Sequence, residues 1–175
     1  MIANIFRSKW FWGILCVAVV ACGRTSKYDP PLTQEFMGYE ISIVALEHAG
    51  RSYDHPLGLR WNAASDKELF VVHLRFKSVS AMKEIHLTSA LECADGSFGR
   101  SDRLSGMLAL PNDELTHQDV FTVRKGQKPK KLYICVSGST HTPDPANPKG
   151  EIIKLIDPTD PTISRVVFDL AQAHK

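Results

Sequence analysis

The chain lacks an apolar run long enough to cross a membrane. Its longest run, Trp10 to Ala21, has 12 residues, whereas a membrane-spanning helix needs roughly 20. Two cations, Arg7 and Lys9, precede this run, and small residues end it. A basic region, an apolar region and then small residues are typical of a secretory signal peptide. We therefore expect residues 1–21 to direct export and then to be removed.

An excess of charge of one sign is also missing from the part that would be exported. The sequence has 21 basic and 19 acidic side chains, and the charges balance once Arg7 and Lys9 leave with the signal peptide. Without a basic field to hold phosphates, nucleic acid is not an expected partner. The densest basic run, Arg124 to Lys131, lies where a turn is expected. A solvated hairpin loop is favoured there over a site for anionic lipid or a polyanion.

The sequence motifs of common hydrolases and metal sites are missing as well. There is no Gly-x-Ser-x-Gly, His-Glu-x-x-His or His-x-His sequence, and no Asp-rich calcium loop. Ser139 and His141 lie close together, but in a connection rich in turn-forming residues, which would not preorganise a catalytic pair. We therefore expect a protein without enzymatic activity and without a cofactor.

The junction Val19-Val20-Ala21-Cys22 resembles the lipobox of bacterial lipoproteins. The resemblance implies cleavage between Ala21 and Cys22, with a lipid on Cys22 that binds the protein to a membrane. The exported part would keep 154 of the 175 residues, enough for one domain with a hydrophobic core. Gly23 rather than an aspartate follows the cysteine, which in lipoproteins of Gram-negative bacteria points to the outer membrane, facing the periplasm. A Gram-positive host would place the domain on the outer face of the plasma membrane.

Few cysteines remain for other roles. Cys16 lies in the signal peptide and Cys22 would take the lipid, which leaves Cys93 and Cys135 in an oxidising compartment. A pair of cysteines there favours a disulfide, which would stabilise the fold by roughly 4 kcal/mol on the chain-entropy model. Neither cysteine has the CxxC or CxxH spacing of a zinc site. Two free thiols, or a metal site completed by distant ligands, are the alternatives.

No part of the exported chain keeps the apolar spacing of a helix over three turns. Apolar and polar residues alternate instead, as they do in strands. The clearest run places Phe70, Val72, Leu74 and Phe76 on one face, which predicts a half-buried antiparallel strand. Other runs lie at Tyr39–Ala45, Ile85–Cys93, Phe121–Val123, Leu132–Val136, Ile152–Ile156 and Arg165–Leu170. About seven short strands with Gly/Pro/Asp-rich connections favour an all-β sandwich over a barrel.

The domain boundaries follow from composition. Residues 22–35 are polar and contain a Pro30-Pro31 step, so we expect a lipidated N-terminus and a flexible tether there. A β-sandwich domain is expected over residues 36–175. The connection from Ser137 to Gly150 has 14 residues, a length at which a loop is usually functional or mobile. The pattern leaves open whether it recognises a partner or only crosses between strands.

The strand runs resemble those of a bacterial lipoprotein family whose extracytoplasmic domain has no known function. The matching segments are Gly38–Ile43, Glu68–Ser78, Leu91–Gly96, Phe121–Gly126 and Leu132–Val136. Ser78-Val79-Ser80 stands where the family usually has an Asn-containing turn. The resemblance implies an immunoglobulin-like (telokin-like) antiparallel β-sandwich, and no reaction.

Aromatic and cationic side chains gather in the connection from His48 to Asn62. They are Arg51, Tyr53, His55, Arg60 and Trp61. This composition is common at binding hot spots, so the segment is a candidate recognition surface. The alternative, which the pattern favours, is a short edge strand whose Trp61 fills the end of the sandwich.

Two histidines offer a further alternative. His73 and His86 fall on the polar faces of successive strand runs. If these strands paired, the two imidazoles could face each other and bind a metal. Two solvent-facing histidines are the favoured interpretation.

Together these features predict a membrane-anchored envelope lipoprotein that presents a non-catalytic β-sandwich to a protein partner. The alternative is a periplasmic module that binds a small ligand or a metal through His73 and His86, or through the connection from His48 to Asn62. A large apolar pocket with a few convergent polar groups would favour the alternative.

Overall fold

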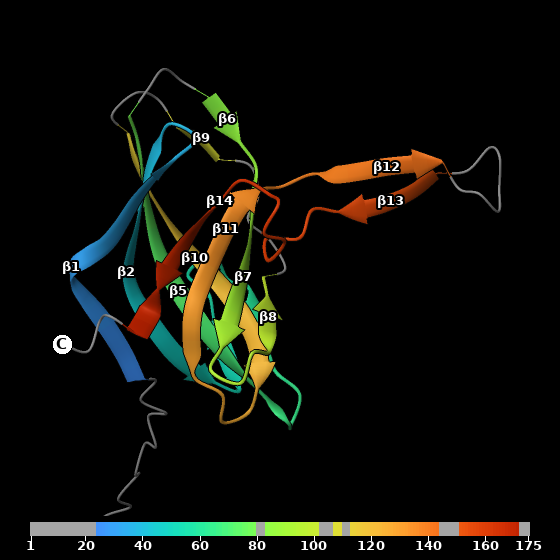
Figure 1. The fold of residues 1–175 in the computed structure, drawn as a ribbon. Coiled ribbons are helices and arrows are strands. Elements are labelled where there is room, and N and C mark those ends of the chain that lie inside the picture. Colours follow the sequence, from blue (N-terminus) through green and yellow to red (C-terminus); the bar gives the residue numbers. More distant parts are fainter. Residues whose placement is uncertain (1–23, 80–82, 102–106, 110–112, 144–150, 172–175) are drawn as a thin grey trace, which may run out of the picture.

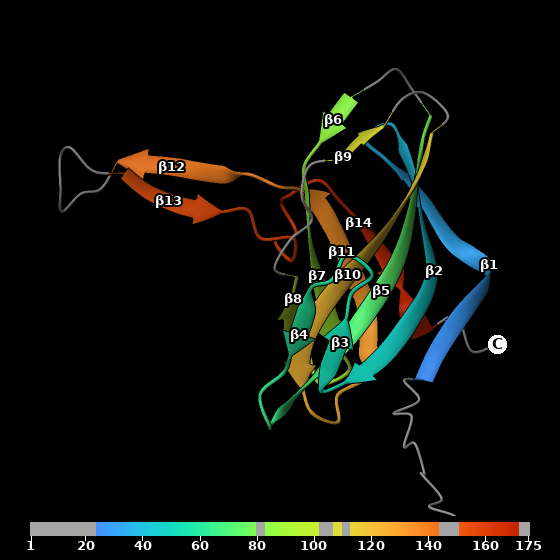
Figure 2. The same cartoon turned by 180° about the vertical axis from the view of Figure 1, so that it is seen from behind.

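The computed structural model describes residues 24–79, 83–101, 107–109, 113–143 and 151–171. These residues form an antiparallel β-sandwich of two four-stranded sheets, with two-stranded sheets at its surface (Figure 1, and from behind in Figure 2). The predicted all-β sandwich is confirmed. Within these ranges, no helix is long and apolar enough to span a membrane.

Eight strands form the two main sheets. The first sheet has the order β1-β2-β5-β10, with β1 at Arg24–Phe36, β2 at Tyr39–Gly50, β5 at Lys67–Ser78 and β10 at Glu114–Arg124. The second sheet has the order β14-β11-β7-β8, with β7 at Leu87–Cys93, β8 at Phe98–Arg100, β11 at Pro129–Val136 and β14 at Arg165–Asp169.

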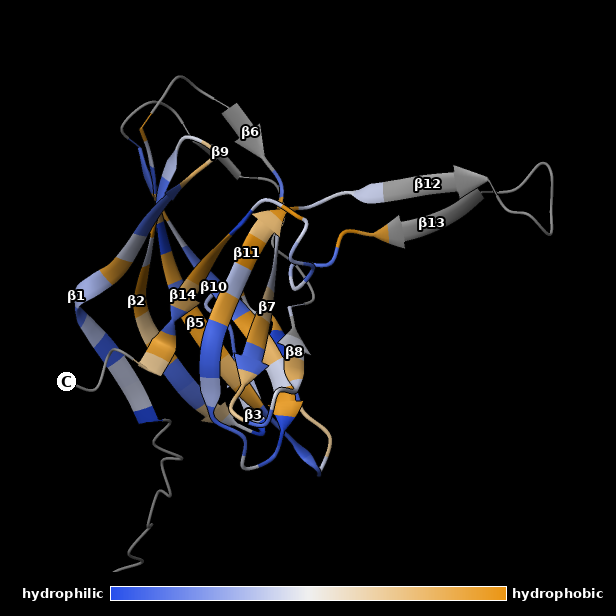
Figure 3. Cartoon of the chain, viewed as in Figure 1, coloured by the Kyte–Doolittle hydropathy of each residue, from blue (hydrophilic) through white to orange (hydrophobic). Residues whose placement is uncertain are grey.

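The core lies between these two sheets. The alternation predicted for β5 is present, because Val72, Leu74 and Phe76 are each at most 1% exposed. Leu132 and Ile134 of β11 are fully buried on the facing sheet and belong to the same cluster. Apolar residues follow the strands of both sheets in Figure 3. Each such side chain contributes roughly 1.5–3 kcal/mol on burial, so the alternating residues hold the two layers together.

The other face of β5 is buried only in its first part. Leu69 and Val71 are buried there, whereas His73, Arg75 and Lys77 are partly or fully exposed, as predicted for a half-buried strand. Val71 is 0% exposed and packs in a second cluster of apolar residues. A hairpin of β3 (Ser52–Asp54) and β4 (Arg60–Asn62) contributes Tyr53 and Trp61 to that cluster. The connection after β2 is therefore a hairpin that covers the outer face of the first sheet.

The expected flexible tether is wrong for residues 24–35. They form most of β1, which pairs with β2 from Arg24 opposite His48 to Phe36 opposite Tyr39. Tyr28 is only 5% exposed and joins the main core, and its hydroxyl donates to the Leu170 carbonyl at 3.5 Å. The polar composition misleads because β1 is an edge strand that buries few side chains, Tyr28 and Phe36, and leaves most of the others exposed or partly exposed.

Two short ladders lie outside the sandwich. β6 (Lys83–Ile85) pairs with β9 (Met107–Ala109). β12 (Ser139–Pro143) pairs with β13 (Glu151–Leu155) to form a hairpin that projects from the sandwich, here called the arm (Figure 1). The predicted connection from Ser137 to Gly150 thus includes one strand of the arm, while residues 144–150 lie outside the described residues.

Candidate functional site

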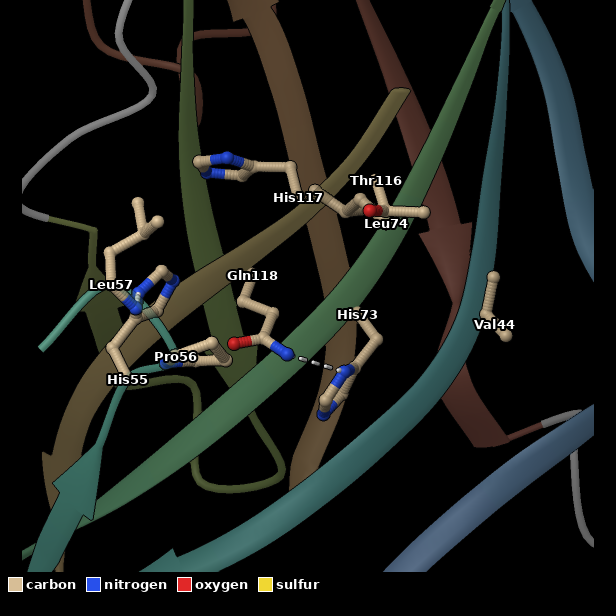
Figure 4. Close-up of a pocket in the computed structure, with 9 residues that line it drawn as sticks. All are labelled: Val44, His55, Pro56, Leu57, His73, Leu74, Thr116, His117 and Gln118. Atoms are coloured by element: carbon tan, nitrogen blue, oxygen red, sulfur yellow. Dashed lines mark hydrogen bonds between the residues drawn. The ribbon is translucent and has the colours of Figure 1, made fainter. Parts of the chain in front are cut away.

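A cavity lies where the β3–β4 hairpin meets β5 and β10. It has a volume of about 400 Å³, and we call it the histidine cavity (Figure 4). Three imidazoles line it together with apolar and polar neighbours: Val44, His55, Pro56, Leu57, His73, Leu74, Thr116, His117 and Gln118. Four segments of the chain that are far apart in sequence therefore supply one site.

A chain of hydrogen bonds orients His73 in this cavity. The Tyr53 hydroxyl donates to Oε1 of Gln118 at 2.6 Å, which leaves the Gln118 amide nitrogen to donate to Nδ1 of His73 at 3.4 Å. Because Nδ1 accepts, Nε2 carries the proton and donates to the Glu47 carboxylate at 3.1 Å. Burial, and next the Glu47 charge, raise the pKa of the Tyr53 phenol, so it stays a donor. These hydrogen bonds favour the tautomer of His73 that carries its proton on Nε2.

His117 differs from its neighbours in having an unpaired atom. Its Nε2 is buried and has no hydrogen-bond partner among the described residues. Burial lowers the pKa of the His117 imidazole, and the nearby His55 lowers it further. The ring is therefore neutral at pH 7, with one ring nitrogen left for a ligand or a water molecule.

Most of the predicted recognition surface comes together at the hairpin. The rings of His55 and Trp61 lie 5.5 Å apart, and Tyr53 lies 6.3 Å from each. Arg60 pairs with Asp54 at 3.4 Å across the hairpin, in solvent. Arg51 is exposed and lies just before the hairpin. Tyr53 and Trp61 pack on the sheet, as the structural alternative predicted, whereas His55 faces the cavity.

The metal alternative at His73 and His86 is wrong in its premise. His73 lies on β5 of the first sheet, whereas His86 precedes β7 of the second sheet, and β5 pairs only with β2 and β10. The two strand runs are consecutive in sequence but belong to different layers. Among the described residues no group of three metal-ligating side chains comes together.

The predicted disulfide between Cys93 and Cys135 is also wrong, because both thiols are free and buried. Cys93 lies opposite Pro129 in the ladder of β7 and β11, and Cys135 lies opposite Thr88. Five residues of strand separate these positions, which is about 17 Å at about 3.4 Å per residue. A disulfide needs Cα atoms about 4.4–6.8 Å apart. The antiparallel register therefore holds the cysteines apart.

The chemistry of the histidine cavity suits binding. Its polar lining consists of three imidazoles, the Thr116 hydroxyl and the Gln118 amide. Its imidazoles can donate or accept hydrogen bonds, and Val44 and Leu57 supply apolar wall. Apolar walls with a few polar groups are typical of small-molecule sites.

Sequence reasoning missed His117, Gln118 and Glu47. They lie on β10 and β2, and only the sheet order brings those strands to either side of β5. The first half of β10 was not predicted as a strand because residues Glu114 to Gln118 are mostly polar. The predicted cleavage and lipid positions, Ala21 and Cys22, lie outside the described residues.

Comparison with known proteins finds distant likenesses in structure. No family model matches the chain, and no curated protein sequence matches it. A conserved hypothetical protein from Bacillus anthracis is similar in structure, with 8% identity over 75% of this chain and 96% of its own, and a TM-score of 0.47. An uncharacterized β-sandwich protein from Clostridium difficile is also similar, with 13% identity, coverage of 60% and 82%, and a TM-score of 0.39.

Proposed function

We propose that this protein is a lipid-anchored envelope lipoprotein whose non-catalytic β-sandwich binds another protein through the arm. The observation that carries the proposal is that β12 and β13 pair only with each other among the described strands. An isolated two-stranded hairpin is at best marginally stable in water. Its free edges are also suited to pairing with a strand of a partner.

The base of the arm supports this use. The Ile156 amide donates to the Gly138 carbonyl at 3.0 Å, which closes the chain where the arm leaves the sandwich. Leu155, at the end of β13, is 73% exposed, a large apolar side chain offered to a partner. Single exposed apolar residues are common, but Leu155 also lies on a strand at the edge of a two-stranded ladder.

Site-specific photocrosslinking in the cells that make the protein tests the proposal. A photoreactive amino acid at Leu155 should give a discrete crosslinked species, and the same group at the exposed Glu35 of β1 should not. Placing the group at Leu57, which is 81% exposed on the β3–β4 hairpin, tests the earlier recognition surface. Crosslinks from Leu57 but not from Leu155 would move the contact to the hairpin and reject the arm.

The anchor is tested by intact mass on protein extracted from membranes. We expect the mass of a chain that begins at Cys22 and carries acyl groups. We also expect the protein to fractionate with the outer membrane. A chain that keeps residues 1–21, or one that lacks acyl groups, would contradict the anchor.

The histidine cavity supports a second candidate function, the binding of a small ligand. The specific observation is the buried, unpaired Nε2 of His117 in a cavity of about 400 Å³. An aromatic carboxylate combines an apolar ring with a hydrogen-bond acceptor, so benzoate is a suitable probe. Saturable shifts of the Gln118 side-chain amide signals in NMR, abolished in His117→Phe, would support this function, and unchanged signals would reject benzoate-like ligands.

A further inference from the structure

The sandwich begins almost immediately after the predicted lipid site. β1 starts at Arg24, so only Gly23 separates it from Cys22. Consecutive Cα atoms are 3.80 Å apart, and the Cα of Cys22 therefore lies within about 8 Å of that of Arg24. The tether expected from the sequence would have kept the domain away from a membrane. With no tether, a lipid on Cys22 would hold one end of the sandwich, the end at which β1 begins, close to the lipid headgroups.

That end, here called the basic end, carries a cation at the tip of every strand of the first sheet. Arg24 begins β1, Arg51 follows β2, Lys67 begins β5 and Arg124 ends β10. All four residues are exposed. Lys67 and Arg124 lie directly opposite each other in the ladder. Like charges in that position are destabilising, so an anion bound there would relieve a repulsion that the fold maintains.

The turn between β10 and β11 adds two more exposed cations, Lys125 and Lys128, at the basic end. Three hydrogen bonds join this turn to neighbouring segments. The Lys125 amide donates to the Asp66 carbonyl at 2.9 Å, and the Gly126 amide donates to the Glu68 carboxylate at 2.8 Å. The Lys128 carbonyl accepts from the Ala94 amide at 2.9 Å. The solvated loop predicted from the sequence is thus a turn whose backbone is held to the sandwich while its lysine side chains are exposed.

A hollow of about 410 Å³ opens at the same end. Arg24 and Lys128 line it together with Ser26, Gln127 and apolar residues. Glu68 lines it too, but one carboxylate oxygen pairs with His48 at 3.0 Å and the other accepts from the Gly126 amide. The carboxylate is therefore already engaged, and the hollow offers two cations to an anion.

Acidic side chains at the basic end are fewer than the cations. Asp66 lies in the turn before β5, and Asp95 lies in the turn after β7. The Asp95 carboxylate accepts from the Ser97 amide at 2.9 Å and from the Ser97 hydroxyl at 2.6 Å. Within the described part of the chain, six exposed cations outnumber these two carboxylates and that of Glu68, so this end is basic although the exported chain is neutral as a whole.

We infer that the basic end of the sandwich lies on a membrane surface containing anionic phospholipid, with the hollow between Arg24 and Lys128 receiving a headgroup phosphate. The inference rests on the proposed lipid anchor at Cys22. The occupant is a lipid surface, because the short distance to Cys22 brings headgroups to this end and their charge complements its cations.

Lysine acetylation in liposomes tests the inference. Protein extracted from membranes is reconstituted into liposomes of phosphatidylcholine alone, or with phosphatidylglycerol, and acetylation of each lysine is measured by mass spectrometry. We expect Lys125 and Lys128 to react at least about threefold more slowly in the anionic liposomes than in the neutral ones. Lys77, at the other end of β5, should react equally in both. Equal reactivity of Lys125 and Lys128 in the two lipids would overturn the inference.

Matched variants separate the basic end from total charge. The double variant Lys125→Gln/Lys128→Gln should lose most of the protection of Lys67 in anionic liposomes. The control Arg60→Gln/Lys77→Gln removes the same charge elsewhere and should keep that protection. Equal loss in both variants would overturn the inference in favour of a general charge effect.

Flotation in high salt distinguishes failure of the anchor from failure of the surface. An anchored protein floats with neutral liposomes in high salt, whatever the acetylation rates of its lysines are. Protein that floats only with anionic liposomes in low salt would lack the anchor while supporting the basic end, because salt screens charge but does not extract a lipid. Protein that floats with neither kind of liposome would overturn both the anchor and the membrane surface.

Inorganic phosphate distinguishes a free anion from a lipid headgroup. If phosphate protects the same lysines in detergent, the hollow binds a free anion, and the inferred lipid surface is overturned.

Discussion

At the scale of single residues, the two free cysteines are expected to be unreactive because they are buried in the core. Cys93 and Cys135 are both 0% exposed. Burial raises the pKa of the Cys135 thiol to about 11 and raises that of Cys93 as well. The thiolate is the reactive form, so both thiols are protected by exclusion from solvent and by protonation.

Alkylation without any reductant checks this. In the folded protein we expect iodoacetamide to leave Cys93 and Cys135 unmodified over a time in which free glutathione reacts fully. In denaturant, and still without reductant, both should react. If both cysteines react in denaturant only after a reductant is added, they form a disulfide, and the register of β7 and β11 is contradicted.

His117 makes stability depend on pH through its lowered pKa. Its folded-state pKa lies below the ordinary value of 6.5, so the unfolded chain binds a proton in a pH range where the folded protein does not. The contribution to stability is complete above about pH 6.5 and is lost as the pH falls through the folded-state pKa. Urea unfolding at pH 7.5 and 5.5 should show a fall in stability that is smaller in His117→Gln. An equal fall in both would mean that other groups cause it.

At the scale of elements, β1 is the strand that the sequence pattern did not predict. Its apolar contacts with the core depend on few residues, among them Tyr28 and Phe36, while most of its other side chains are exposed or partly so. The alternation that identifies β5 is broken in β1, where the register with β2 shifts between Lys27 and Leu32. A broken alternation with two prolines is difficult to distinguish from a linker.

Replacing Tyr28 distinguishes a strand from a tether. Tyr28→Ala removes a large side chain from the core and should lower the free energy of unfolding by about 3 kcal/mol. The neighbouring control, Lys27→Ala, changes an exposed side chain and should stay within about 0.5 kcal/mol. Denaturant titration measures both. A Tyr28→Ala protein as stable as the unmodified one would mean that β1 does not belong to the folded domain.

The arm should be dispensable for folding. Gly138 and Ile156 are joined by a backbone hydrogen bond at its base, so a two-glycine turn can replace residues 139–155. We expect this deletion to change the free energy of unfolding by less than about 1 kcal/mol, because the arm projects from the sandwich (Figure 1) and its described side chains, Ser139 and Leu155, are exposed. A large loss of stability would give the arm a structural role and weaken its assignment to a partner.

At the scale of the whole molecule, the sandwich has two different ends. β11 runs from Pro129 at the basic end to Val136, where the chain leaves for the arm. Seven residue steps at about 3.4 Å place these ends about 24 Å apart. Anchored at Cys22, the sandwich would hold the arm away from the membrane, where a partner could reach it.

Energy transfer to labelled lipid headgroups checks this orientation. Single dyes on Gln127→Cys and on Leu155→Cys can be attached selectively, because Cys93 and Cys135 are buried. In proteoliposomes we expect strong transfer from position 127 and weak transfer from position 155. Equal transfer from both positions would contradict an upright sandwich on the membrane.

The sequence by itself determined the class of fold and the composition of its core. Alternation along Phe70 to Phe76 specifies one face of a strand whatever its neighbours are, because successive side chains point to opposite sides. The predicted export signal and the lipobox resemblance are likewise local patterns, readable without a fold. The same holds for the gathering of aromatic and cationic residues from His48 to Asn62.

Only the tertiary structure decided which strands are neighbours, and with them every relation across the sheets. The register of β7 and β11 separates Cys93 from Cys135, and the assignment of β5 and β7 to different sheets separates His73 from His86. The order of the first sheet unites His73 with Gln118, and it aligns Lys67 with Arg124 at the basic end. Local alternation carries no information about pairing partners, because many sheet orders bury the same residues equally well.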